Sequence, residues 1–114
     1  MEPFDAFTDV QDHLVDLARA HAEDLVLRRF LEAVDDVGAD GVREVLGRLR
    51  SLYGLSRIEA DLCWFLEAGY ISSSKSKAIR GEVNALCDEI HPDALELVDG
   101  FAIPDSCLAA PIAT

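Results

Sequence analysis

The sequence predicts an all-α protein: an up-down helical bundle of four main helices followed by a short C-terminal helix. Apolar residues recur at intervals of three and four along most of the 114 residues, which is the spacing of one helix face. Glycine and proline interrupt this pattern at points that suit short loops, and no stretch alternates apolar and polar residues as a strand would. The length allows one domain with a genuine core, so residues 1–114 are treated as a single helical domain.

The first helix is expected from Thr8 to Gly38. Thr8 and Gln11 have the spacing of a capping box, and Gly38 suits a left-handed helix end. A second helix is expected from Asp40 to Gly54.

Ser56 and Glu59 form another possible capping box, which predicts a third helix ending at Gly69. The polar stretch 72–77 leads into a fourth helix with apolar positions at Ile79, Val83, Leu86 and Ile90. Pro92 suits the first turn of a short fifth helix that ends at Gly100, and a turn with an extended end follows from Phe101.

The first helix changes its apolar face halfway along. The first half places one set of residues on one face: Val10, Leu14, Leu17, His21 and Leu25. The second half carries its apolar residues on the opposite face: Val26, Leu27, Phe30 and Val34. Helical drift of about 20° per heptad cannot produce this switch, so the two halves must bury against different neighbours. One neighbour is the rest of the bundle, and the other is either a far bundle helix or a surface outside the chain. The set beginning at Val26 is our candidate docking face.

The charge excludes several partners. The chain carries 22 acids against 10 Lys and Arg, a net charge of −12, of which residues 1–40 contribute −8. Nucleic acid and anionic membrane surfaces require clustered basic residues, so neither is an expected partner. No apolar run approaches the roughly 18 residues of a membrane span, and MEPFDAF at the start resembles no signal peptide, so we expect an intracellular protein. The acidic surface is either solvated or docks on a basic partner.

Residues that could carry chemistry form no recognisable site. Cys63, Cys87 and Cys107 form no CxxC pair, so we expect three reduced and mostly buried thiols. His13 and His21 point about 80° apart on one helix, which does not suit a shared metal, and His21 in an apolar stripe reads as a neutral core residue. No dinucleotide, P-loop, nucleophile-elbow or zinc-protease motif is present, so no catalytic, cofactor-binding or metal-ligating residue is predicted.

Two weaker candidates involve loops and aromatic residues. Lys75, Lys77 and Arg80 lie next to four serines at a helix start and are a candidate phosphate contact; the alternative is an exposed serine-rich loop that caps the fourth helix. The aromatic residues Tyr53, Trp64, Phe65 and Tyr70 are expected in the core or an interface rather than around a ligand.

The order of segments resembles the C-terminal domain of acyl-CoA oxidases, within the acyl-CoA dehydrogenase superfamily. Three features carry the resemblance: the Ala-His of 20–21 followed by Arg-Arg-Phe at 28–30, the Leu-Tyr-Gly-Leu turn at 52–55, and Leu-Val-Asp-Gly-Phe-Ala-Ile-Pro-Asp at 97–105. The match is best over residues 8–113, and Gly100 stands where the family usually has alanine.

The resemblance implies a role outside the chemistry. Full-length acyl-CoA oxidases of fatty-acid β-oxidation are FAD flavoproteins that convert acyl-CoA and O₂ to trans-2-enoyl-CoA and H₂O₂. Their flavin, acyl-CoA pocket and catalytic glutamate belong to an upstream core that this chain does not contain. We therefore expect an accessory helical domain that docks on that core, binds no cofactor itself and is inactive alone, located in the cytoplasm, or in the peroxisome of a eukaryote. The chain could be an excised domain, a truncated gene product or a separate subunit. Homo-oligomers are a further possible partner arrangement.

Two other classes of function remain open from the residues. One is a stand-alone helical interaction module with a different partner. The other is a small helical enzyme of the chorismate-mutase kind, for which only Arg28, Arg29 and Arg50 could supply the cations that a dianionic substrate needs.

Overall fold

The computed structural model describes residues 3–107, and every regular element in this range is helical. The α-helices are α1 (Pro3–Asp36), α2 (Asp40–Ala60), α3 (Leu62–Glu67), α4 (Ser73–Ile90) and α5 (Ala94–Asp99), with 3₁₀ turns η1 at His91–Asp93 and η2 at Asp105–Cys107. The predicted all-α class is confirmed. The extended end predicted beyond residue 107 lies outside the described residues.

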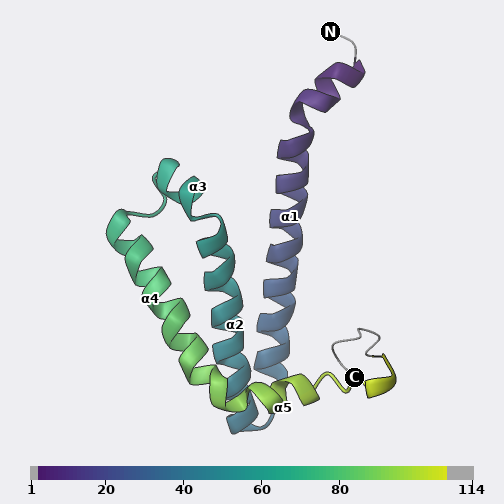
Figure 1. The fold of residues 1–114 in the computed structure, drawn as a ribbon, viewed down its shortest axis with the longest axis vertical. Coiled ribbons are helices and arrows are strands. Elements are labelled where there is room, and N and C mark those ends of the chain that lie inside the picture. The colour runs from purple at the N-terminus through teal and green to yellow at the C-terminus, as the bar shows by residue number, and fades with distance from the viewer. Residues whose placement is uncertain (1–2, 108–114) are drawn as a thin grey trace.

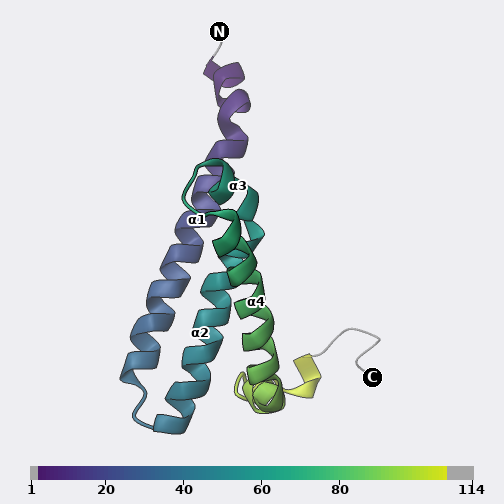
Figure 2. The same cartoon turned by 90° about the vertical axis from the view of Figure 1, so that its left-hand side faces the viewer.

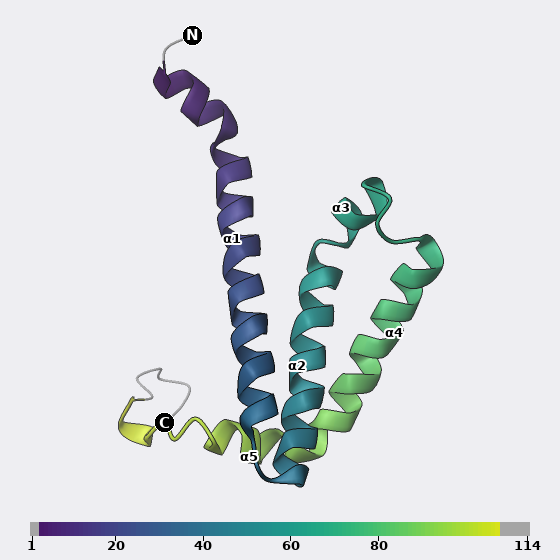
Figure 3. The ribbon, with the colours of Figure 1, turned by 180° about the vertical axis from the view of Figure 1, so that it is seen from behind.

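The central element is α2, which packs on α1 at one side and on α4 at the other (Figure 1). α1 and α2 form an antiparallel hairpin closed at residues 37–39, and α3 forms the tip that joins α2 to α4. α5 crosses the base at a steep angle to α4, and the first part of α1 rises beyond the other helices (Figures 2 and 3). The arrangement leaves the first part of α1 and all of α5 at opposite ends of the molecule.

The first helix begins earlier than predicted. α1 already includes Phe4, and the Thr8 hydroxyl donates to the Phe4 carbonyl oxygen at 3.0 Å instead of capping a helix start. A hydroxyl that bonds back to the carbonyl four residues earlier often bends a helix. Figure 1 shows the first turns of α1 inclined to the rest of the helix, which fits this bond.

The end of α1 is near the predicted position but forms differently. The helix stops at Asp36, and Gly38 is not left-handed. Instead, the Arg43 guanidinium donates through both Nε and Nη2 to the Val37 carbonyl oxygen, with Nε at 3.0 Å. A side chain from α2 therefore satisfies a carbonyl just beyond the end of α1, where free carbonyls need partners.

The predicted break at Gly54 is absent, and α2 continues to Ala60. Gly54 has an ordinary helical backbone, and a Cβ placed on it would lie 3.7 Å from Leu27 Cδ1. Here glycine lies within the helix beside Leu27 and does not end it, and an added Cβ would make an ordinary van der Waals contact. Ser56 likewise opens no helix, because its hydroxyl donates to the Tyr53 carbonyl oxygen at 2.9 Å. As a result the predicted third helix shrinks to the six residues of α3.

The boundaries around α4 agree with prediction. Gly69 follows α3 with φ +74°, the left-handed conformation that glycine adopts without strain. The Ser72 hydroxyl accepts from the Lys75 backbone N–H at 3.3 Å and caps α4. Pro92 lies in the first positions of η1, which leads directly into α5.

The core is small for a chain of this length. Four apolar side chains among residues 3–107 are buried: Val34, Leu62, Leu86 and Ile90.

Ion pairs Arg48–Glu89 and Arg80–Glu59, both 3.3 Å between N and O, join α2 to α4 at the surface. The chain exposes 8968 Å², against about 6,200 Å² for a compact monomer of this length. Its radius of gyration is 18.7 Å, whereas a compact domain of this length has a radius of gyration of about 13 Å.

The described helices do not include a membrane span: none in residues 3–107 is both long enough and apolar enough to cross a bilayer.

Candidate functional site

The side of α1 that faces α2 changes from polar to apolar along the helix. Five residues spaced three or four apart lie on this side of α1: Arg19, Glu23, Leu27, Phe30 and Val34. The first two contact α2 or its end through ion pairs, and the last is 3% exposed. From residue 19 to residue 34 one side of α1 therefore faces α2, with ion pairs near the α3 end of α2 and apolar contacts near the loop at 37–39.

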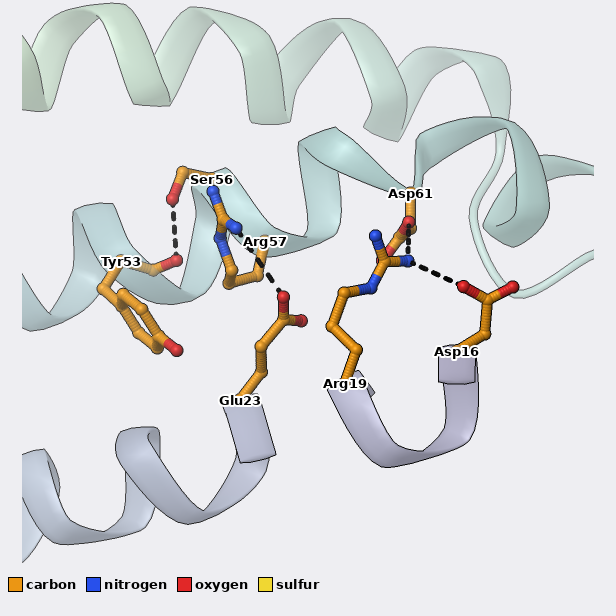
Figure 4. A network of polar contacts seen from close by, with 7 residues as sticks. All are labelled: Asp16, Arg19, Glu23, Tyr53, Ser56, Arg57 and Asp61. Atoms are coloured by element: carbon orange, nitrogen blue, oxygen red, sulfur yellow. Dashed lines mark hydrogen bonds and ion pairs between the residues drawn. The ribbon is translucent and has the colours of Figure 1, made fainter. Parts of the chain in front are cut away.

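The charged contacts form the network drawn in Figure 4. Arg19 Nη2 lies 2.9 Å from Asp61 Oδ1, just beyond α2, and 3.6 Å from Asp16 Oδ1 on its own helix. Arg57 Nη1 of α2 lies 3.6 Å from Glu23 Oε1, and the Glu23 side chain is 23% exposed. These pairs fix how α1 lies along α2, although pairs this exposed to solvent each stabilise the fold only weakly.

A groove of about 360 Å³ lies between α1 and α2 beside this network. Apolar lining comes mainly from Leu27, Ile58 and Phe65, with Tyr53 and Gly54 at the α2 side. Its charged lining consists of Glu23, Asp24, Asp61 and Arg57. The arginine is paired with Glu23, and Asp61 is paired with Arg19, so the groove offers neither a free cation for an anionic ligand nor a nucleophile beside a base.

The placement of the candidate docking face corrects its interpretation. Val34 is buried, Leu27 and Phe30 are half-buried, and only Val26 is 50% exposed. Most of this face therefore packs inside the chain. The prediction failed because α1 presents ion-pairing residues to α2 in its first half, so that the apolar face of that half points away from the bundle.

The exposed apolar surface of α1 is the face of its first half. Phe7, Val10, Leu14, Leu17 and Leu25 are all exposed, together with His21. The set begins on the first part of α1, which rises beyond the other helices (Figures 1 and 3), and continues to the part that lies alongside α2. At about 1.5 Å per residue this stripe is about 27 Å long. The first helix therefore carries two apolar faces, of which that of its second half is largely covered and that of its first half is exposed. His21 is exposed rather than in the core.

A second exposed apolar surface lies at α5. Leu95 is 81% exposed and Phe101 is 75% exposed, and Val98 and Ile103 are exposed as well. The other side of α5 borders a groove of about 420 Å³ between α5 and the start of α2. The groove is lined by residues of α2, η1 and α5: Gly41, Val42, Val45, Leu46, Asp93, Glu96 and Leu97. The sequence pattern placed α5 correctly but gave no sign that most of its apolar residues would be free.

Three of the four aromatic candidates, Trp64, Phe65 and Tyr70, gather at the tip of the α2–α4 hairpin, whereas Tyr53 lies within α2. Trp64 and Tyr70 stack with ring centroids 5.7 Å apart, and Phe65 meets Trp64 edge-on at 5.1 Å. Trp64 and Tyr70 are exposed, whereas Phe65 and Tyr53 are half-buried. This cluster is at the surface rather than in the core.

The candidate phosphate contact is not assembled into one site. Lys75 and Lys77 are about 200° apart around α4, so they leave the helix on opposite sides. Arg80 pairs with Glu59, and the Ser72 hydroxyl is occupied by the cap of α4 and by Ser74 at 3.0 Å. The contacts agree with the alternative interpretation, in which residues 72–77 include an exposed serine-rich segment that caps α4.

The remaining candidates lie apart on the surface. Cys63, Cys87 and Cys107 are free thiols, as predicted, but all three are exposed, which corrects the expectation of burial. No group of three His, Cys, Asp or Glu residues within residues 3–107 is placed to hold a metal ion.

Two arginines of the enzyme alternative, Arg28 and Arg29, form local ion pairs on α1. Arg28 pairs with Asp24 and Arg29 pairs with Glu32, each at 2.8 Å, on the exposed surface of α1. The hydrogen bond with Asp24 raises the pKa of Arg28 above its usual value. These two cations serve local pairs on one helix, so they do not form the convergent cluster that a dianion requires.

Comparison with known proteins identifies the family. The family model "Acyl-CoA oxidase" matches residues 1–114. A putative acyl-coenzyme A oxidase of Arabidopsis thaliana is 42% identical over 98 residues, which are 86% of this chain and 51% of that protein. The peroxisomal acyl-coenzyme A oxidase 3 of the same plant is also 42% identical over 98 residues, 86% of this chain but 14% of its own length.

The human peroxisomal acyl-coenzyme A oxidase 3 is 37% identical over 98 residues, 84% of this chain and 14% of that protein. No solved structure matches the chain. The chain thus spans between about one seventh and one half of the length of these relatives. By the family match and by these identities, the chain belongs to the acyl-CoA oxidase family.

Proposed function

We propose that this chain is the accessory C-terminal helical domain of an acyl-CoA oxidase-type flavoprotein of fatty-acid β-oxidation. It docks on the catalytic core, which carries out acyl-CoA + O₂ → trans-2-enoyl-CoA + H₂O₂, and has no catalytic role by itself. The core belongs to the same polypeptide or to a separate one. Its location follows the parent enzyme: the peroxisome in a eukaryote, as in the names of several relatives, and the cytoplasm otherwise.

The observation that carries this proposal is the large total exposed surface, to which exposed apolar side chains of α1 and α5 contribute. The chain exposes about 2,800 Å² more than a compact monomer of this length, a difference taken between 8968 Å² and the scaling value of about 6,200 Å². Stable interfaces bury about 800 Å² on each partner. The excess therefore has room for an extensive interface, and the exposed apolar side chains of α1 and α5 supply its hydrophobic part.

The residues present do not suit FAD. The groove between α1 and α2 is lined by three carboxylates and one arginine, and that arginine already pairs with Glu23. A pyrophosphate would meet net negative charge there, which opposes its binding. The second groove adds Asp93 and Glu96 and no basic residue. We therefore assign the flavin to the core, and no step of the oxidation is derived from this chain.

Docking of this domain would act on catalysis through position. Covering the edge of the core excludes water and holds the reacting groups of the core in place, a contribution made without any reacting group of its own.

The test compares the chain alone with the chain plus a core. The purified chain, supplied with FAD and an acyl-CoA, should produce no H₂O₂ in a peroxidase-coupled assay. A separately prepared, FAD-loaded core of an acyl-CoA oxidase that lacks its own C-terminal segment should form a 1:1 complex with it in analytical ultracentrifugation. Peroxide from the chain alone would refute the non-catalytic role. Failure to bind the core, with capture of an unrelated protein instead, would favour the stand-alone interaction module.

A further inference from the structure

The groove between α5 and the start of α2 combines apolar residues with two carboxylates. Its volume of about 420 Å³ is within the range of about 300–1,000 Å³ that is typical of ligand pockets. It lies at the base of the molecule, which α5 crosses (Figures 1 and 2). Four apolar residues line it: Val42, Val45, Leu46 and Leu97. Gly41 contributes no side chain, and nothing lies within 4 Å of the place where its Cβ would be.

Asp93 and Glu96 supply the negative charge of this lining. They are three residues apart at the start of α5, so their side chains leave neighbouring positions on one side of the helix. Asp93 is half-buried and occupies the N-cap position of α5, where an aspartate usually accepts a hydrogen bond from the helix start, yet its side chain makes no such bond. Neither carboxylate forms an ion pair within residues 3–107. Both charges are therefore available to a ligand in the groove.

The lining includes no basic residue that would balance these charges. The basic residues nearest to it along α2 are engaged elsewhere: the Arg43 guanidinium donates to the Val37 carbonyl oxygen, and Arg48 pairs with two glutamates. The sequence has no Lys or Arg in residues 91–114. The groove therefore attracts a cation and repels an anion.

The apolar lining decides which kind of cation fits. Ca²⁺ and Mg²⁺ take about six or more oxygen ligands, and no group of three His, Cys, Asp or Glu residues in the described part of the chain could hold such an ion. An apolar side chain would instead remove water from two carboxylates without replacing its hydrogen bonds, which is unfavourable. A lysine or arginine side chain meets both requirements, because its aliphatic stem lies on apolar surface while its charged head reaches the carboxylates.

We propose that the groove between α2 and α5 receives a lysine or arginine side chain of the catalytic core. This inference rests on the proposed function, and adds to it a contact point on this domain and the chemistry of the residue that enters it. A second copy of this chain is a poorer occupant, because each copy carries a net charge of −12 and the two would repel each other.

The first test uses n-butylammonium chloride, which reproduces a lysine side chain, at an ionic strength of about 0.15 M. Titrated into the ¹⁵N-labelled chain, it should shift the amide signals of the apolar lining until they saturate. The double variant Asp93→Asn/Glu96→Gln should weaken this binding about fivefold or more, because both partners of the ammonium lose their charge. The matched control Asp99→Asn/Asp105→Asn removes the same charge from exposed residues outside the groove lining and should change the affinity by less than about twofold.

The controls separate charge from apolar contact. Circular dichroism should show the same helix content and Tm in both double variants, since neither pair forms an ion pair that the fold uses. Equal shifts with uncharged 1-butanol would show that the groove does not select a cation, and would overturn the inference. Equal losses in the two double variants would overturn it as well.

The second test measures binding to the FAD-loaded core described above by isothermal titration calorimetry. D93N/E96Q should weaken this binding about fivefold or more, while D99N/D105N should stay within about twofold. Unchanged binding by D93N/E96Q would overturn the assignment of the groove and leave docking intact, whereas failure of the unmodified chain to bind the core would overturn the proposed function. Self-association of the chain alone that is lost in D93N/E96Q would give the groove to a second copy, and would also overturn the inference.

Discussion

Replacing Gly54 with alanine should stabilise this protein, although the sequence pattern marks Gly54 as a helix end. In the structure Gly54 lies inside α2 with an ordinary helical backbone, and its added Cβ would meet Leu27 Cδ1 at 3.7 Å, a normal contact distance. Alanine is favoured over glycine inside a helix by about 0.8–1 kcal/mol. The contact with Leu27 adds about 0.1–0.2 kcal/mol for each atom pair.

The matched controls are two other glycines. Gly81→Ala, inside α4 with nothing within 4 Å of its new Cβ, should gain the helical preference alone. Gly69→Ala should instead cost about 1–2 kcal/mol, because φ is +74° there. Unfolding is followed by circular dichroism at 222 nm, and each 1 kcal/mol should move Tm by about 4 °C in a chain of this size.

The sign of the change at Gly54 decides between two structures. A rise in Tm at least as large as that of G81A supports one continuous α2. A fall similar to that of G69A would mean that α2 ends at Gly54 in a left-handed turn, and would refute the packing of α1 described above.

Three further substitutions test the core, a cap and the polar network. Val34→Ala should cost about 2 kcal/mol in urea unfolding because Val34 is 3% exposed, while Val26→Ala at 50% exposure should cost less than half of that; equal costs would contradict the burial of this face. Ser72→Ala should cost about 1 kcal/mol, since it removes the acceptor for the Lys75 N–H, and Ser72→Asp should restore it. A double-mutant cycle on Arg19 and Asp61 should give a coupling of about 0.5 kcal/mol that shrinks in high salt; a coupling above about 2 kcal/mol would mean that the pair is more buried than it is here.

The helical secondary structure and several helix boundaries could be predicted, because both depend on residues that are neighbours in the sequence. The spacing of apolar residues predicted helices throughout, and Gly69 and Ser72 act as their types suggest. The Thr8 and Ser56 patterns failed for one reason: a hydroxyl either accepts from an N–H ahead of it or donates to a carbonyl behind it, and the capping spacing does not distinguish the two. Ser72 caps α4 because the left-handed turn at Gly69 separates it from α3, so that its hydroxyl is free to accept from the Lys75 N–H.

Which face of α1 is free could not be predicted from hydropathy. Hydropathy predicts that the apolar residues of a helix mark its packed side, yet α1 presents Arg19 and Glu23 to the end of α2. Long side chains can cross between helices to form ion pairs, and a pattern of apolar positions does not reveal such a partner 34 or 42 residues away. The continuation of α2 through Gly54 could not be predicted either, because glycine is a common helix end and its local pattern does not show that α1 packs beside it.

The central place of α2 has a consequence for how the molecule opens. Because α1 and α4 both pack on α2, amide hydrogens in the middle of α2 should exchange with deuterium more slowly than those of the first turns of α1, which exchange through local fraying. Neighbouring helices in the sequence are also neighbours in space, which favours rapid folding through local hairpins. Binding at the free end of α1 would therefore slow deuterium uptake most where the isolated chain is least protected.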